Sequence, residues 1–185
     1  MGGKAYKEHE KKAHDNKRRN KKQHNDKNRF DEQIRILKAD PEIQKMASFT
    51  MHNGNTTLQH VENVAECSFR LAEKLGIDID EEALARGAML HDFYLYTFKE
   101  TKMSPYRHGI SHPETALKNA SKNHHLTDKE TNIIRSHMWP MTLLHPPMNK
   151  EAVLVCLADK YCAANEMLLK KHDLSEKKRQ RKNKI

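Results

Sequence analysis

Hydrophobic residues recur three and four positions apart along most of the chain, which is the spacing of helices that bury one face. The clearest stripe, within residues 57–75, consists of Val61, Val64, Ala65, Ser68, Leu71, Ala72 and Leu75. Thr57 is expected to cap this helix at its start, and Gly76 is placed to end it. No stretch of useful length alternates polar and apolar residues as a strand would. The pattern therefore predicts an all-α protein.

Short signals at helix starts divide the rest of the chain into further predicted elements. Asp40 before Pro41 is typical of a helix start, and Asp80 is expected to cap another helix. Thr127 and Glu130 have the spacing of a capping box, in which each residue satisfies the other's backbone amide. These signals indicate at least three helices besides the one over residues 57–75.

Residues 93–110 are expected to form a loop whose aromatic side chains could wall a pocket. Pro113 is expected to open the next helix, which would place His112 at its start. The most apolar helix is expected over about residues 152–169. Gly87 lowers the helix propensity of its segment, so we expect it to let another backbone or a metal ligand come close.

Metal-binding side chains interrupt these predicted core helices at widely separated positions. They are His60, His91, Asp92, His112, His137 and Asp159. Asp159 follows seven consecutive apolar residues, so its buried charge needs a cation, for which Arg70, Arg86 or a metal could serve. Imidazole and carboxylate together suit a hard to borderline divalent metal. The set therefore predicts a metal site inside the helical core.

The same residues carry a resemblance to the HD-domain superfamily of metal-dependent phosphohydrolases, whose fold is all-helical. The signature of that superfamily is a His, then a His-Asp doublet, then a distant Asp, and the matching stretches are residues 59–65, 88–92 and 157–160. Residues 111–116 and 133–137 resemble the two additional histidine motifs of its binuclear members. The resemblance covers about residues 50–170 and implies an HD-domain helical bundle.

For this chain the resemblance implies a first metal ion held by His60, His91, Asp92 and Asp159. A second ion would lie on His112 and His137, with Asp92 bridging the two ions and serving as the catalytic residue. The resemblance thus implies two divalent ions, for which iron, manganese, cobalt and zinc are the candidates.

The chain departs from the superfamily directly after the doublet. Many binuclear relatives have Ile-Gly-Lys there, and the Lys helps to hold phosphate, whereas this chain has Phe93-Tyr94-Leu95. Phosphate contacts are therefore expected from elsewhere, and the candidates are Lys99, Arg107, His108 and Lys160.

The implied function is hydrolysis of a phosphate mono- or diester, of a nucleotide or dinucleotide, by a metal-activated hydroxide. The expected partner is then a small phosphorylated substrate. One alternative is a di-iron oxygenase, since some relatives of the HD fold use much the same ligands. Another is a metal-stabilised helical module that binds a phosphorylated ligand, or nucleic acid through basic tails. Iron with oxygen consumption would favour the first alternative, and nucleic-acid affinity that falls steeply with salt would favour the second.

The net charge of +9 is concentrated at the two ends of the chain. Residues 1–30 hold 11 Lys or Arg against 4 Asp or Glu, and residues 170–185 hold 8 against 2, so the middle is net negative. Because the ends have few apolar residues, we expect a disordered or fraying helical arm over residues 1–30, an HD domain over residues 31–170 and a basic tail over residues 171–185. Such tails aid solubility or make weak contacts with nucleic acid or anionic membranes.

The remaining signals concern redox state and location. Cys67, Cys156 and Cys162 lie in apolar helical contexts without a CxxC pair, which favours reduced core residues over a disulfide or a zinc knuckle. No apolar run approaches the length of a membrane span, and the N-terminus lacks the apolar stretch of a signal peptide. We therefore expect a cytoplasmic protein without a transmembrane segment.

Overall fold

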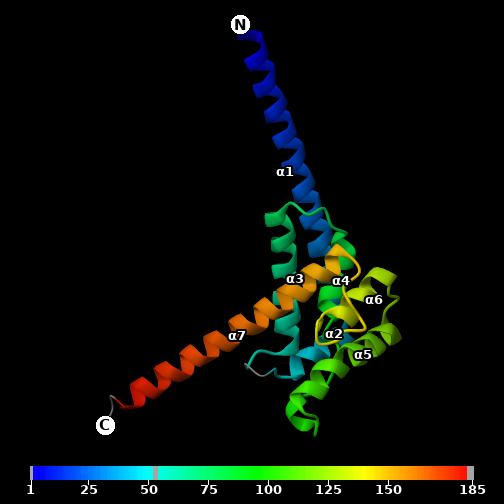
Figure 1. The fold of residues 1–185 in the computed structure, drawn as a ribbon, viewed down its shortest axis with the longest axis vertical. Helices are drawn as coiled ribbons and strands as arrows, with labels where there is room; N and C mark the ends of the chain where they lie inside the picture. The colour runs from blue at the N-terminus through cyan, green and yellow to red at the C-terminus, as the bar shows by residue number, and fades with distance from the viewer. Residues whose placement is uncertain (1, 52–53, 183–185) are drawn as a thin grey trace.

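The computed structural model describes residues 2–51 and 54–182, and over these residues the chain is helical (Figure 1). Its α-helices are α1 (Gly2–Ala39), α2 (Pro41–Gln44), α3 (Thr57–Leu75), α4 (Glu81–Leu90), α5 (Pro105–Asn123), α6 (Asp128–Ser136) and α7 (Lys150–Lys182). Two 3₁₀ turns cover Lys45–Ser48 and Phe98–Glu100. Within the described residues, β pairing is limited to an isolated bridge between Thr50 and Thr56. The predicted all-α class is confirmed.

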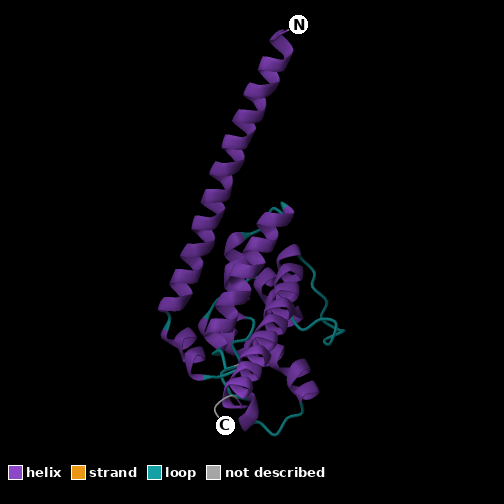
Figure 2. Ribbon diagram, turned by 90° about the vertical axis from the view of Figure 1, so that its left-hand side faces the viewer, coloured by secondary structure: helices purple, strands orange, loops and turns teal. Residues whose placement is uncertain are grey.

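Four helices form the centre of the molecule. Helix α3 packs against α4 and α7, and α6 packs against the same two helices. The second half of α1 packs against α4, and α5 lies against α6. Figure 2 shows that the long helix at the N-terminus rises beyond the other helices. The first half of α1 and the last part of α7 project away from this body in different directions (Figure 1). The apolar stripes predicted from the sequence therefore meet in one core between α3, α4, α6 and α7.

The helix starts follow the predicted signals closely. The side chain of Asp40 accepts a hydrogen bond from the Glu42 amide at the start of α2, and Asp80 does the same for the Ala83 amide in α4. The capping box predicted before α6 is present. Helix α3 also begins with a capping box, but its N-cap is Thr56, one residue earlier than expected. Gly76 ends α3 with a φ of 64°, a backbone conformation that costs glycine little.

The predicted start of the helix around Pro113 is wrong. Helix α5 begins at Pro105, where the side chain of Ser104 caps it, so Pro113 lies inside the helix. A proline at the first helical position loses no intrahelical hydrogen bond, which makes the Ser104-Pro105 pair the stronger signal. The loop expected over residues 93–110 is correspondingly shorter, and His112 lies well inside α5 instead of at its start.

Helix α1 continues through the boundary expected between residues 30 and 31. Phe30 is buried, and its ring centroid lies 4.6 Å from that of Phe69 in α3. Arg29 donates two hydrogen bonds to Glu81 at the start of α4. The disorder or fraying expected for residues 1–30 stays a prediction, but the last residues of that arm pack with the core. Residues 1 and 183–185 of the two expected tails lie outside the described residues.

Helix α7 likewise runs through the expected boundary at residue 171. The three cysteines are free, and Cys156 and Cys162 are buried, as expected for reduced core residues. Among the described helices, none combines the length and the apolar character that a membrane crossing requires.

Candidate metal centre

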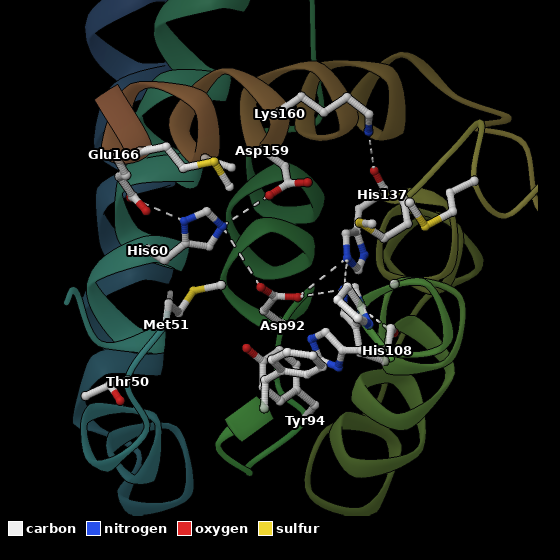
Figure 3. Close-up of a pocket in the computed structure, with 18 of the residues that line it drawn as sticks. Thr50, Met51, His60, Asp92, Tyr94, His108, His137, Asp159, Lys160 and Glu166 are labelled. Atoms are coloured by element: carbon white, nitrogen blue, oxygen red, sulfur yellow. Dashed lines mark hydrogen bonds and ion pairs between the residues drawn. The ribbon is translucent and has the colours of Figure 1, made fainter. Parts of the chain in front are cut away.

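The six candidate ligands come from five different segments of the fold. His60 lies in the first turn of α3, and His91 and Asp92 directly follow α4. The others lie inside α5, directly after α6 and within the buried half of α7; they are His112, His137 and Asp159. All six are buried, and Figure 3 shows His60, Asp92, His137 and Asp159 facing one another. The packing of α3, α4, α6 and α7 thus brings together residues that lie up to 99 positions apart.

The first group of ligand atoms surrounds one side of Asp92. The Nε2 atom of His60 lies 3.1 Å from Asp159 Oδ1 and 4.0 Å from Asp92 Oδ2. The Nε2 atom of His91 lies 3.7 Å from Asp92 Oδ2 and 3.8 Å from Asp159 Oδ1. His60, His91 and Asp92 each offer an atom within 4.8 Å of the others, which is a spacing that one ion could span.

The second group lies on the other oxygen of Asp92. Its Oδ1 atom is 3.2 Å from His112 Nε2 and 3.5 Å from His137 Nε2. The three residues again offer ligand atoms within 4.8 Å of one another. Asp92 therefore presents one carboxylate oxygen to each group, which is the arrangement expected of a bridging ligand.

The hydrogen bonds of the second group direct two imidazole nitrogens at each other. The Nδ1 atoms of His112 and His137 donate to the carbonyls of His108 and Ile134, at 2.9 and 2.7 Å. In the neutral rings both Nε2 atoms then carry lone pairs, yet they lie only 2.7 Å apart. Two lone pairs facing each other repel unless a proton or a metal ion lies between them.

A second orphaned atom belongs to the first group. The Nδ1 atom of His91 donates to the Ala88 carbonyl at 2.7 Å, which leaves the Nε2 lone pair directed at the carboxylates. Among the described residues, this fully buried Nε2 has no hydrogen-bond partner, and neither has Asp92 Oδ1. Buried polar atoms rarely lack a hydrogen-bond partner, and bound divalent ions would give His91 Nε2 and Asp92 Oδ1 the partners they need. The donor set therefore fits a metal centre.

Glu166 is a member of the site that the sequence analysis missed. Its carboxylate lies 3.3 Å from the Nδ1 atom of His60 and also accepts a bond from Asn63. Glu166 follows Asp159 by seven residues in α7, so the two side chains lie on the same face of the helix. An acidic residue two helical turns after a proposed ligand could therefore have indicated Glu166 from the sequence.

The charges in the cluster shift several pKa values. Burial alone would lower the pKa of His60, but hydrogen bonds with Asp159 and Glu166 outweigh it and raise that pKa to about 10. Burial also opposes ionisation of Asp159, yet its hydrogen bond with His60 and the nearby histidines hold its pKa well below the usual range. Burial and the neighbouring histidines lower the pKa of His137 to about 3. Ionised carboxylates and a neutral His137 are the states in which these groups bind metals.

A cavity of about 640 Å³ opens beside the ligands. Tyr94 and Phe98 line it, as expected for aromatic residues after the His-Asp doublet, whereas Tyr106 is exposed elsewhere and Phe93 is buried in the core. The lining of the cavity also includes four methionines, which are Met51, Met138, Met141 and Met167.

The candidate phosphate-binding residues are divided by the structure. His108 and Lys160 line the cavity, whereas Arg107 is exposed and is not among the lining residues. The side chain of Lys99 lies outside the described part of the structure. The ammonium group of Lys160 is bonded to the carbonyls of His137 and Cys156 at 2.9 and 3.2 Å, and to the Cys156 sulfur.

The two arginines considered as partners of Asp159 have other roles. Arg70 pairs with Glu66 in its own helix, and Arg86 pairs with Glu130 in α6. The prediction that either could neutralise Asp159 is wrong, because their guanidinium groups are engaged away from the centre. The charge of Asp159 is met by His60 instead.

Comparison with known proteins identifies one family. The family model described as HD domain matches residues 57–164, which is more than half of the chain. The matched range begins with α3 and ends within α7, so it includes all six candidate ligands. No curated protein and no solved structure matches the sequence.

Proposed function

Because the chain belongs to the HD domain family, we propose that it is a metal-dependent hydrolase that cleaves a phosphate mono- or diester. The proposal places two divalent ions in the centre, with Asp92 between them. The expected substrates are nucleotides or dinucleotides.

The observation that carries the proposal is the position of the Asp92 carboxylate. One of its oxygens faces the histidines of α3 and α4, and the other faces those of α5 and α6. A structural ion pair would need histidines on only one side of the carboxylate. Two sets of imidazole lone pairs on either side of one buried carboxylate favour two ions, and paired ions are typical of enzymes that hydrolyse phosphate esters.

The protein's own residues would hold and orient this centre. His60, His91, Asp92 and Asp159 would hold one ion, and His112, His137 and Asp92 the other. Two ions held in this way would supply an activated water and would neutralise charge on the phosphoryl group. The carbonyls that accept from the histidine Nδ1 atoms fix the ring orientation, so the Nε2 atoms need no rearrangement to bind.

The surrounding residues would position the substrate beside the ions. His108 lines the cavity, stacks on His112 with ring centroids 4.7 Å apart and is held by a 3.0 Å hydrogen bond with the Tyr96 hydroxyl. Its place next to a ligand of the second ion suits a contact with a phosphoryl oxygen. The apolar residues of the lining would exclude bulk water from the reacting group.

The proposal is tested by metal analysis and by hydrolysis assays on Asp92→Ala, His112→Ala and a control, His125→Ala, whose side chain is exposed. Asp92→Ala should lose both ions and the release of phosphate from every ester, because both ions share that carboxylate. His112→Ala should retain about one ion per chain, since it contributes only to the second group. His125→Ala should match the unmodified chain.

Full turnover by Asp92→Ala would contradict the proposal. So would a purified protein that binds iron and consumes oxygen but releases phosphate from no ester, because that result would indicate an oxygenase.

A further inference from the structure

We infer that the preferred substrate is a phosphate monoester whose organic group carries a flat unsaturated ring, such as an aryl or nucleoside monophosphate. This inference rests on the proposed function and narrows its substrate class. It is carried by the walls of the cavity and not by the metal ligands.

The first observation is the number of methionines in the lining of the cavity. Four of the nine methionines in the chain line the cavity, from the loop before α3, the connection after α6 and helix α7. Phe98 and Tyr94 close another side. Thioethers adapt to the shape of a ligand and make favourable contacts with the edges and faces of aromatic rings. Such a lining fits an unsaturated ring better than a second phosphate.

The second observation is the scarcity of cations. Among the described residues, the cavity is lined by the carboxylates Asp92, Asp159 and Glu166 but by a single Lys or Arg, Lys160. The Lys160 ammonium already has three acceptors, which are two carbonyls and a sulfur. Polyphosphates are usually bound by several free Arg and Lys side chains or by ions of their own. This cavity offers few such contacts.

The charge balance leads to the same substrate class. Three carboxylates and one ammonium leave the lining negative before any ion binds. Two divalent ions would change the lining charge to about +2 with neutral histidines and an uncharged bound water, which matches the charge of about −2 on one phosphate monoester at neutral pH. A triphosphate would carry an excess of negative charge, and Lys160 is the single Lys or Arg among the described lining residues to meet it. A diester would leave part of the positive charge unmet.

The volume allows a group of this kind. A cavity of about 640 Å³ lies within the range of roughly 300 to 1,000 Å³ that holds small organic ligands. One phosphoryl group beside the metal-binding residues leaves most of that space for the organic group, which would then lie against the methionines of the lining.

Trp139 provides a direct readout of binding. It is the only tryptophan in the sequence, it is 40% exposed, and its two neighbours, Met138 and Pro140, both line the cavity. A ligand that fills the cavity should therefore change its fluorescence, whether or not any bond is cleaved.

The experiment measures the affinity of the metal-loaded full chain for probes that resist hydrolysis. Phenylphosphonate and a nucleoside 5′-phosphonate carry rings, methylphosphonate does not, and a non-hydrolysable nucleoside triphosphate analogue and a diester phosphonate complete the set. We expect at least one ring-bearing monophosphonate to bind roughly tenfold more tightly than methylphosphonate. The comparison between the two ring-bearing probes distinguishes an aryl from a nucleoside substrate. The metal-free protein should bind none of the five.

Wall variants test the cause of this preference. Met141→Gln combined with Met167→Gln keeps the side-chain length but makes the wall polar, so the preference for rings should fall to about threefold or less while the metal content stays unchanged. Met148→Gln is the matched control, because Met148 is 77% exposed and is not among the residues that line this cavity. It should behave as the unmodified chain.

The inference is overturned if the triphosphate or diester probe binds most tightly, or if methylphosphonate binds as well as both ring-bearing probes. A preference for rings that survives in the double Gln variant also overturns it. These outcomes differ from failure of the proposed function, which would show as selective phosphonate binding without phosphate release from any ester.

Discussion

The candidate ligand histidines are held in two different ways. His91, His112 and His137 each donate from Nδ1 to a carbonyl three or four residues earlier, so their own helical segments set the ring orientation. His60 instead has the Glu166 carboxylate at Nδ1, from a helix 106 positions away in sequence. A carboxylate behind a ligating histidine fixes its tautomer and raises its basicity. The first metal group therefore depends on a contact between α3 and α7.

Substitution of Glu166 should weaken the first ion selectively. We expect Glu166→Ala to lower the affinity of that ion by about 10- to 100-fold, and Glu166→Gln to have a smaller effect because the amide oxygen can still accept from Nδ1. Competition with a chelator, followed ion by ion, measures this. Glu73→Ala, at an exposed position of α3, is the control. Unchanged affinity for both ions in Glu166→Ala would show that the carboxylate does not support His60.

Metal binding should release a proton from His60. Its pKa is raised to about 10 because, despite burial, it makes hydrogen bonds with Asp159 and Glu166. Below that pH the metal-free ring is protonated, so a proton competes with the ion and the affinity should rise as the pH increases from 6 towards 9. Asp159 is already ionised there, because its pKa is lowered.

Calorimetry in two buffers of different ionisation enthalpy should detect the release of at least about one proton per chain at pH 7.5. Equal heats in both buffers, with an affinity that does not change between pH 6 and 8, would contradict a protonated His60 in the metal-free protein.

At the scale of helices, the contact between α4 and α6 sets the distance between the two metal groups. Helix α4 leads into His91 and Asp92, and α6 leads into His137. Gly87 lies where they meet, and a Cβ atom at this position would come within 2.6 Å of the Ile133 side chain. The expectation that Gly87 admits a backbone or a metal ligand is wrong, since it admits this isoleucine.

Gly87→Ala should destabilise the protein by about 1–3 kcal/mol through overpacking, partly offset by the better helix propensity of alanine. The separation of the helices should also increase, which would weaken the second metal group. In an Ile133→Ala background the same substitution should cost less, because the two nearest clashing atoms, Cδ1 and Cγ2, are gone and only Cβ, at 2.9 Å, stays. Urea unfolding of the two single variants and the double variant measures the coupling. Additive effects would show that α4 and α6 are not in close contact here.

At the scale of the whole molecule, α1 is both a projecting arm and part of the core. Its first half extends away from the body (Figure 1). Its second half is attached through Phe30, which packs on Phe69, and the ammonium group of Lys27 lies 4.9 Å from both ring centroids. The basic arm should therefore be removable only up to the point where these contacts begin.

Two truncated chains test where that point lies. A chain of residues 20–171 keeps Phe30 and should retain its metal content and nearly all of its free energy of unfolding. A chain of residues 31–171 loses Phe30 and should be less stable by about 3–5 kcal/mol, as for removal of a buried phenylalanine side chain. Chemical unfolding and metal analysis compare the two. Equal stability of both chains would place the edge of the domain after Phe30.

Much of the fold could be predicted from the sequence because helix starts and apolar stripes are local properties. Asp40, Asp80 and the Thr127–Glu130 pair cap helices whatever the rest of the chain does. The candidate ligands could be found in the same way, since a histidine or aspartate on an apolar stripe must face the core. The Ser104-Pro105 start of α5 is equally local, and it is a stronger signal than Pro113, which lies inside the helix.

The partners of these residues depend on the tertiary structure. Periodicity shows that His60 and Asp159 face inward, but not that Glu166 supports His60 or that Ile133 fills the space over Gly87. Nor could charge alone show that Arg107 lies away from the cavity while Lys160 reaches it. Such contacts depend on the angles and distances at which whole helices pack. These angles and distances are set jointly by all the side chains between the helices. The sequence by itself therefore determined the helices and which ligands face inward. Only the packing of the helices decided which residues each ligand contacts.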